Sequence, residues 1–248
     1  MLEQERVARA EAEAAARVKD EFLAVAAHEL RTPVTTIKGY AQLLNRRITD
    51  AGDPRLRPTL EIIDQAANRL MRLIQDVLDV SATALGRFEL RRERLDLGAL
   101  VAEVAGRVPS LTERHRVTVS AIAGVIVEAD RDRIEQVLMN LLMNAIRYSP
   151  HQGVVAVTVD ACGPEATVSV QDQGLGIPAE RQARIFELFY RAHDGADRDR
   201  QGMGVGLHLS RQVIERHGGR LTFVSAEGQG STFWFSLPLA EPAPAPLS

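Results

Sequence analysis

One cysteine, Cys162, is present among the 248 residues, so the chain cannot form an internal disulfide. Disulfides belong to oxidising compartments, and a single cysteine therefore fits a reducing one. No run of 18 apolar residues occurs, which argues against a membrane-spanning helix in this sequence. Residues 1–21 are rich in alanine, glutamate and arginine and lack the apolar core of a signal peptide. We therefore expect no direct insertion of this chain into a membrane.

The sequence also lacks an excess of charge of one sign. Its 30 basic and 33 acidic residues give a formal net charge of −3, so a basic surface for nucleic acid is not expected. With 45% apolar and 25% charged residues, the composition is that of a globular protein. The pattern predicts an exposed connector helix over residues 1–20 and a disordered tail, rich in proline and alanine, over residues 241–248.

Apolar residues in the first third of the chain repeat at alternating steps of four and three. The first series is Leu23, Ala27, Leu30, Val34, Ile37, Ala41 and Leu44, and the second is Leu56, Leu60, Ile63, Ala67, Leu70, Ile74 and Val77. Such spacing gives each helix one narrow apolar seam, and the turn-rich break between them favours an antiparallel hairpin. Because a lone hairpin covers its seams poorly, we predict that residues 21–85 form a homodimer as a four-helix bundle.

From residue 86 to residue 240 the pattern predicts a second domain that mixes strands and helices. Helices are expected over residues 97–108, 129–149, 178–186 and 205–218, and strands near 86–97 and over 117–122, 125–129, 154–161, 167–172, 220–226 and 231–239. Asp130 is the expected N-cap of the second helix. Two alternating strands that flank a short turn at residues 162–165 predict a hairpin. The expected fold is an α+β sandwich with helices over one face of the sheet.

A single histidine, His28, lies on the outer face of the first predicted helix. At 100° per residue it falls roughly 145° from the centre of the apolar seam. Thr32 shares its face and Glu29 lies to one side, whereas Pro33 sits inside the apolar stripe and is expected to kink the helix without ending it. A neutral imidazole offers a nucleophilic nitrogen, and a carboxylate can take the proton from the other. Taken alone, however, an exposed histidine is usually only a solvated residue.

The predicted helix after Asp130 carries two asparagines, Asn140 and Asn144, on one edge. Arg147 lies on the same flank, and Tyr148 lies near the helix end. Amide oxygens suit hydrated Mg²⁺, and an arginine beside them suits phosphate. Two asparagines on a helix are also ordinary surface residues, so the pattern by itself leaves both interpretations open.

Two glycine-rich segments follow. Asp172, Gly174, Gly176 and Ile177 come directly after a strand, and Gly202, Gly204, Val205, Gly206 and Leu207 lead into a helix. Glycines allow close backbone approach and positive φ, and the N–H groups at a helix start favour phosphate. A carboxylate at the end of a strand can accept a hydrogen bond from an exocyclic amine. Each segment alone is weak evidence, because similar strings form ordinary turns.

The order of these segments resembles that of two-component sensor histidine kinases. Residues 28–33, HELRTP, resemble the H-box of the HisKA type. The asparagine helix resembles the N-box, with Arg147 where lysine is common, and Asp172–Pro178 resembles the G1 box. Residues 202–207 resemble the G2 box, with Val205 where leucine is commoner. Phe186, Phe189 and Arg191 resemble the F-box, and amphipathic packing of the two phenylalanines is expected as well.

The resemblance implies a Bergerat-type ATP-binding domain of the kinase, gyrase and Hsp90 group. It implies ATP and Mg²⁺ as cofactors, phosphorylation of His28 with the assistance of Glu29, and transfer to an aspartate of a response regulator. In the family, the threonine at the position of Thr32 is linked to dephosphorylation of the regulator. The resemblance also implies that Asp172 selects adenine, that Thr232 lines the adenine pocket, and that residues 191–201 form a lid over ATP.

Two other functions remain open from the sequence. An ATPase clamp of the chaperone or topoisomerase kind would use the same nucleotide site, but it would not need the exposed His28–Glu29 pair on a heptad hairpin. A catalytically silent dimer scaffold would not need the asparagine and glycine clusters. For a kinase of this family the expected location is the bacterial cytoplasm, as a free protein or as the cytoplasmic part of a membrane-anchored sensor.

Overall fold

The computed structural model describes residues 30, 32–41, 44, 60, 62–63, 66–67, 70–71, 73–75, 79, 90–108, 115–149, 153–192 and 203–241. The chain divides into two compact units, Met1–Phe88 and Glu89–Ser248. Within the described ranges, no helix is both long enough and apolar enough to cross a lipid bilayer.

Every described residue of the first unit is helical. Residues 32–41 form one unbroken helical run that contains Pro33, which confirms that the proline does not end the helix. The Thr36 hydroxyl donates a hydrogen bond to the Thr32 carbonyl oxygen at 3.0 Å. Hydroxyl groups that bond to the carbonyl one turn earlier tend to bend helices, and so does proline.

The apolar stripes of this unit are only partly covered within one chain. On the second helix, Ala66 and Leu73 are 8% and 5% exposed, and each precedes a predicted seam residue by one position. By contrast, Leu60 and Ile74 of the predicted seam are 54% and 41% exposed, and Val34 of the first helix is 48% exposed. A helix in a four-helix bundle contacts neighbours on two sides. One flank of each stripe is therefore left for a further partner.

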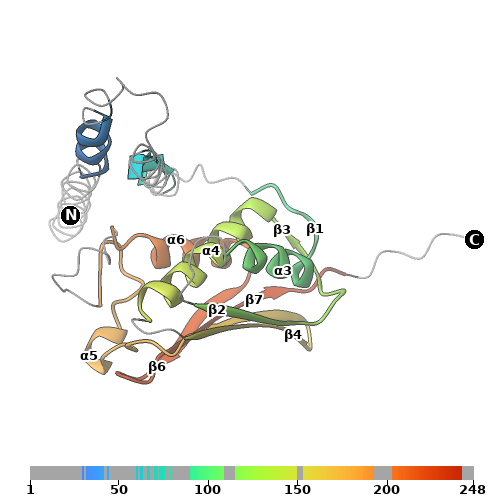
Figure 1. Ribbon diagram of the computed structural model, residues 1–248. Coiled ribbons are helices and arrows are strands. Elements are labelled where there is room, and N and C mark those ends of the chain that lie inside the picture. The colour runs from blue at the N-terminus through green and yellow to red at the C-terminus, as the bar shows by residue number, and fades with distance from the viewer. Residues whose placement is uncertain are drawn as a thin grey trace, which may run out of the picture. The chain divides into compact units, whose positions relative to one another are not determined.

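The second unit contains seven strands and four helices in its described part (Figure 1). The order is β1 (Glu93–Asp96), α3 (Leu97–Arg107), β2 (Arg116–Ala121), β3 (Ile126–Ala129), α4 (Arg131–Arg147), β4 (Val154–Cys162), β5 (Glu165–Gln171), α5 (Ala179–Gln182), α6 (Gly206–Arg216), β6 (Arg220–Ser225) and β7 (Ser231–Pro238). The predicted α+β composition is confirmed.

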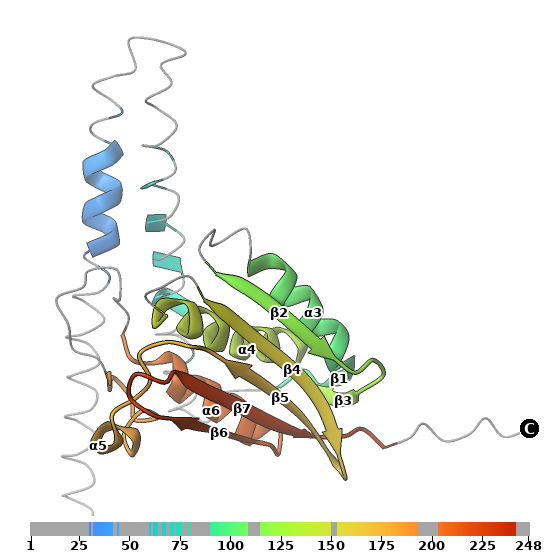
Figure 2. The same ribbon diagram turned by 60° about the horizontal axis from the view of Figure 1, so that its bottom comes forward.

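Five strands form one sheet in the order β2-β4-β5-β7-β6, and β1 pairs with β3 in a separate two-stranded sheet. Only the β2–β4 pair of the larger sheet is parallel. The predicted hairpin is confirmed, since β4 and β5 pair antiparallel from Ala156 opposite Gln171 to Cys162 opposite Glu165. Helices α3, α4 and α6 all lie on one face of this sheet, as predicted (Figure 2).

The core lies between the sheet and these helices. Val155, Val157 and Val159 of β4 are each 1% exposed, as expected for alternate residues that face the helices. The matching stripe on α4 is formed by Ile134, Val137, Leu138, Leu141, Leu142 and Ala145. This stripe holds α4 against the sheet and leaves Asn140 and Asn144 at its edge.

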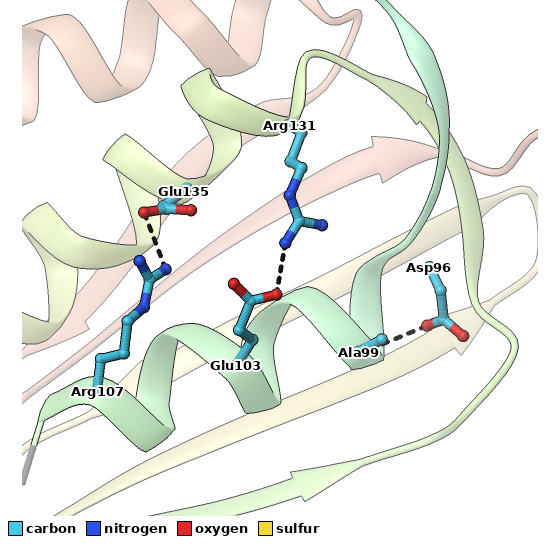
Figure 3. Close-up of polar contacts among 6 residues, drawn as sticks. All are labelled: Asp96, Ala99, Glu103, Arg107, Arg131 and Glu135. Carbon is cyan, nitrogen blue, oxygen red and sulfur yellow. Dashed lines mark hydrogen bonds and ion pairs between the residues drawn. The ribbon is translucent and has the colours of Figure 1, made fainter.

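Polar contacts set the start of α3 and join it to α4 (Figure 3). Asp96 caps α3 by accepting a hydrogen bond from the Ala99 N–H at 3.1 Å. Two ion pairs then cross between the helices, Arg107–Glu135 at 2.8 Å and Arg131–Glu103 at 2.5 Å. Because all four side chains are at least 30% exposed, each pair stabilises the fold by no more than about 1 kcal/mol. They align helices that the apolar core already holds.

One predicted helix is much shorter than expected. Residues 178–186 were expected to be helical, but α5 covers only Ala179–Gln182. The chain continues in tight turns, in which the Arg184 N–H bonds to the Arg181 carbonyl and the Glu187 N–H bonds to the Arg184 carbonyl. The prediction was wrong in its extent because these turns carry Ile185, which is 4% exposed, into the core. By contrast, the predicted N-cap of α4 is confirmed, since Asp130 accepts from the Arg133 N–H at 3.2 Å.

Candidate functional site

The asparagine edge of α4 lies against the first turns of α6. The Asn140 side-chain amide donates to the Ser210 hydroxyl at 2.9 Å, and Asn144 Nδ2 lies 3.4 Å from Asn140 Oδ1. A Cβ atom added to Gly206 would lie only 2.3 Å from Asn140 Oδ1. Arg147, in the last turn of α4, is half-buried. Two clusters that are well separated in the sequence therefore meet at the start of α6.

The start of α6 has no side-chain cap. Val205 holds the N-cap position without a capping hydrogen bond, and it is 1% exposed. Met203 is also buried, and Leu207 is half-buried in the first turn. The segment is thus anchored by apolar side chains, while the N–H groups of the first turn remain for an anion. Gly202 lies outside the described residues.

The Gly206–Asn140 contact makes a prediction. In a Gly206→Ala variant, the new methyl group would collide with the Asn140 amide, so the Asn140 side chain would have to turn out of its present position against α6. We expect about tenfold weaker binding of ATP in the presence of Mg²⁺, measured by calorimetry, and a lower thermal unfolding midpoint. The matched control is Gly106→Ala in α3, where no heavy atom lies within 4 Å of the added Cβ. Affinity equal to that of the wild type in the Gly206 variant would show that this close approach is dispensable.

The predicted aromatic cluster also reaches the glycine-rich segment. Phe189 has φ +66°, the left-handed conformation that side chains other than glycine rarely adopt. Its N–H donates to the Gly204 carbonyl at 3.1 Å. Gly204 has φ +69°, and a Cβ atom there would lie 2.7 Å from the Phe189 carbonyl carbon. Glycine adopts positive φ without strain, but phenylalanine does not, so the conformation of Phe189 is held by its contact with Gly204.

Phe186 packs as an apolar anchor. Its ring meets the Phe223 ring edge-on, with 5.8 Å between centroids, which supports the packing interpretation of this residue. Its carbonyl oxygen lies 3.0 Å from His208 Nδ1 on α6. Arg191 is half-buried, and residues 193–201 of the predicted lid lie outside the described residues. The described part of this segment is thus attached to both the sheet and α6.

Asp172 follows β5 and is 6% exposed. Its Oδ1 accepts hydrogen bonds from the N–H groups of Gly174, at 2.8 Å, and Ser231, at 3.2 Å. No group in the described part of the chain bonds to its Oδ2. Burial raises the pKa of Asp172 above its ordinary value, although the two backbone hydrogen bonds oppose that rise. One carboxylate oxygen is therefore positioned to accept a hydrogen bond from a ligand.

The turn after Asp172 fits closely between α4 and the β6–β7 turn. A Cβ atom at Gly174 would lie 2.4 Å from the Tyr148 carbonyl oxygen, and one at Gly176 would lie 1.8 Å from the Ala226 carbonyl oxygen. Gly176 also has φ +62°. Ile177 is 8% exposed, and Tyr148 is half-buried. Glycine is required at both positions, because any side chain would displace neighbouring backbone.

Ser231, which is not among the residues predicted from the sequence, lies beside Asp172. Its N–H binds Asp172, and it is 8% exposed. Thr232 pairs with Val224, which is 65% exposed, so alternation places Thr232 on the open face of the sheet. The structure thus does not bring Thr232 to Asp172. The feature of the sequence that could have identified Ser231 is the period of two in β7, which puts Ser231 on the same face as the fully buried Phe235.

The acceptor cluster belongs to the other unit. Thr32 is half-buried on the helical run 32–41, whereas His28 and Glu29 lie outside the described residues. Their roles therefore stay predictions.

Two family models match the chain. Residues 18–84 match HisKA, the His Kinase A (phospho-acceptor) domain, and residues 129–241 match HATPase_c, the histidine kinase-, DNA gyrase B-, and HSP90-like ATPase. The first range contains the acceptor cluster, and the second contains all the nucleotide-site residues described above.

Curated relatives are similar over most of the chain. Circadian input-output histidine kinase CikA of Thermosynechococcus vestitus is 37% identical over 240 residues, which cover 94% of this chain and 33% of that protein. Sensor histidine kinase WalK of Bacillus subtilis is 33% identical over 227 residues, which cover 89% of this chain and 37% of that protein. The chain therefore spans about a third of the length of these relatives.

Solved structures of histidine kinases share the fold. The catalytic domain of histidine kinase ThkA is 31% identical, with a TM-score of 0.53, and the match covers 60% of this chain and 96% of that one. Full-length ShkA in complex with AMPPNP is 27% identical, with a TM-score of 0.65 over 92% of this chain and 47% of that one. ThkA in complex with the response regulator protein TrrA is 28% identical, with a TM-score of 0.60 over 92% of this chain and 61% of that one.

Proposed function

Since this chain belongs to the sensor histidine kinases of two-component systems, we propose that it transfers the γ-phosphoryl group of ATP to His28 and then to an aspartate of a response regulator. The proposal is supported by two features that one domain combines. Asp172 keeps one carboxylate oxygen for a ligand, and Asn140 lies in close contact with Gly206. A HisKA domain with its phospho-acceptor motif precedes this domain in the same chain.

Adenine would bind at Asp172. The free Oδ2 would accept a hydrogen bond from the exocyclic amine, and the Ser231 N–H would keep the carboxylate in place. Ile177 and Tyr148 would contribute apolar surface beside it. The AMPPNP complex of ShkA supports ATP as the nucleotide.

The phosphates would lie between α4 and the start of α6. Asn140 and Asn144 would hold Mg²⁺, and the donor set fits, because Asn144 Oδ1 accepts no hydrogen bond from the described residues and Mg²⁺ prefers oxygen ligands. Bound there, the ion would neutralise charge on the phosphate oxygens. Arg147, the N–H groups of the α6 first turn and Arg191 would add positive potential. Catalysis would then consist mainly of positioning and electrostatics.

The acceptor chemistry would take place at His28. A neutral ring nitrogen of His28 would attack the γ-phosphorus, and the bond from phosphorus to the β–γ bridging oxygen would break. Glu29 would take the proton from the other ring nitrogen as the ring becomes positive. Thr32, one turn further on, would assist the opposing activity, the dephosphorylation of the regulator.

The chain would work as a homodimer in the bacterial cytoplasm. The exposed apolar flank formed by Val34, Leu60 and Ile74 would be buried against the same flank of a second chain. The complex of ThkA with its response regulator supports a receiver domain as the partner that takes the phosphoryl group.

Incubation with γ-labelled ATP and Mg²⁺ tests the proposal. We expect one acid-labile, base-stable phosphoryl group per acceptor site, mapped to His28 by mass spectrometry, and its transfer when a cognate receiver domain is added. Release of phosphate without any phosphoprotein would favour an ATPase clamp instead. Absence of ATP binding in calorimetry would favour a catalytically silent scaffold.

A further inference from the structure

A buried histidine, His217, joins the ends of α4 and α6 away from the nucleotide site. It caps the C-terminus of α6 and is 3% exposed. Its Nδ1 lies 2.7 Å from the Val213 carbonyl oxygen, an acceptor only, so Nδ1 carries the proton. Its Nε2 is therefore unprotonated and accepts a hydrogen bond from the Asp130 backbone N–H at 3.0 Å. Both bonds require this one neutral tautomer.

The segment that leads in from the helical unit is tied to the same point. The Asp130 carboxylate, besides capping α4, accepts a hydrogen bond from the Arg91 N–H at 2.9 Å. The Arg92 guanidinium donates to the Arg216 carbonyl oxygen, in the last residue of α6, at 2.6 Å. The incoming segment, the start of α4 and the end of α6 thus form one cluster, which we call the linker clasp: Arg91, Arg92, Asp130, Arg216 and His217.

The linker clasp lies on the two helices that build the phosphate site. Helices α4 and α6 pack side by side over the sheet (Figure 1), and further along them Asn140 meets Gly206. A helix transmits displacement along its length because hydrogen bonds from each N–H to the carbonyl four residues earlier hold successive turns together. The clearance at Gly206 is so small that a modest shift at the clasp changes how Asn140 and the first turn of α6 face each other.

We propose that His217 is a positioning residue for the nucleotide site, and that its protonation opens the linker clasp and weakens nucleotide binding. The inference rests on the proposed function and adds a regulatory input to the same site. A protonated Nε2 would aim an N–H at the Asp130 N–H, so the bond between α6 and α4 would be replaced by repulsion between two donors. The ring would then have to move, and the clasp would lose its central contact.

The surroundings of the His217 ring determine the pH at which it is protonated. Burial lowers the pKa of His217, its hydrogen bond to Val213 opposes this, the positive charge of Arg92 lowers the pKa further, and the Asp130 carboxylate raises it. The neutral form therefore persists below the ordinary pKa of histidine, and the clasp opens only when the pH falls below this lowered pKa. Displacement of Arg92 with the incoming segment would remove one positive charge and favour protonation.

Two substitutions distinguish the effect of protonating His217 from the effect of losing its side-chain contacts. Glutamine places an oxygen near the position of Nε2, so His217→Gln keeps an acceptor for the Asp130 N–H and cannot titrate in this range. Asparagine reaches only the position of Nδ1, so His217→Asn keeps the Val213 bond and loses the bond to Asp130 at every pH. Magnesium ADP serves as the probe, because its binding requires no phosphorylation of His28.

Dissociation constants for magnesium ADP would be measured by calorimetry on the full chain from pH 7.5 down to a pH at which NMR shows the His217 ring to be protonated. We expect wild-type affinity to fall about fivefold more than that of His217→Gln, a loss equal to one hydrogen bond. The His217→Asn variant should bind about fivefold more weakly than the wild type at pH 7.5. A wild-type to glutamine ratio that does not change with pH would overturn the inference while leaving the proposed function intact.

Measurements on the wild type alone serve if a variant does not fold. The His217 ring would be titrated by NMR, and its midpoint should coincide with the midpoint of the affinity loss. Titration of His217 without a change in affinity would contradict the inference. No binding of magnesium ADP at pH 7.5 would overturn both the inference and the proposed function.

Discussion

His28→Gln is expected to reduce incorporation of γ-labelled phosphate by at least about a thousandfold, to background. Glutamine resembles histidine in size and polarity, but its amide nitrogen has no available lone pair and cannot form a stable phosphoryl adduct. The residues assigned to ATP all lie in the unit Glu89–Ser248, so the dissociation constant for ATP should remain within about twofold of the wild type. Labelling after gel separation and calorimetry measure the two quantities.

The matched control is His151→Gln, because His151 belongs to none of the motifs. This variant should label as the wild type does. If His28→Gln still labels at the wild-type level, the assignment of the acceptor is wrong. If it instead loses ATP binding, the effect comes from the fold and not from the nucleophile.

Asp172→Asn is expected to weaken ATP binding by about a hundredfold or more. The asparagine Oδ1 can still accept from the Gly174 and Ser231 N–H groups, so the turn should keep its shape. The second position, however, becomes an NH₂ donor that faces the adenine amine. Two opposed donors in a buried site cost several kcal/mol, which corresponds to at least two orders of magnitude in affinity. Calorimetry with ATP and Mg²⁺ measures the change.

The same substitution should not destabilise the protein. Burial raises the pKa of Asp172, so at neutral pH the folded state holds a carboxylate in an unfavourable environment. The folded state binds more protons than the unfolded state between the ordinary pKa of aspartate and this raised value. Asp172 therefore lowers stability above the raised value, and this loss is relieved as the pH falls through it. The Asn variant lacks this dependence and should unfold at an equal or higher temperature at pH 7.

Asp160→Asn on β4 is the matched control, because Asp160 is exposed and lies on a strand outside the site. It should bind ATP as tightly as the wild type. Wild-type affinity in Asp172→Asn would remove Asp172 from the site. A large fall in its unfolding temperature would show that the carboxylate is needed for the fold instead.

Local patterns predicted most of the catalytic unit because neighbours along the chain determine them. The N-cap at Asp130, the β4–β5 hairpin and the spacing of Asn140 and Asn144 each depend on residues within one helix or one turn. The helix expected over 178–186 failed for the opposite reason. The apolar spacing of this segment suits a helix, but burial of Ile185 in the core favours tight turns after α5.

By itself, the sequence determined the residue types to which we assign the chemistry, their order, and the helix or strand that holds most of them. Only the tertiary structure decided which of them meet. Asp172 binds the N–H of a residue 59 positions later, and Asp130 binds His217 across 87 positions. It also decided that Ser231 and not Thr232 faces Asp172. Such contacts depend on how sheet and helices pack, since periodicity and capping specify local conformation but not which surfaces come together.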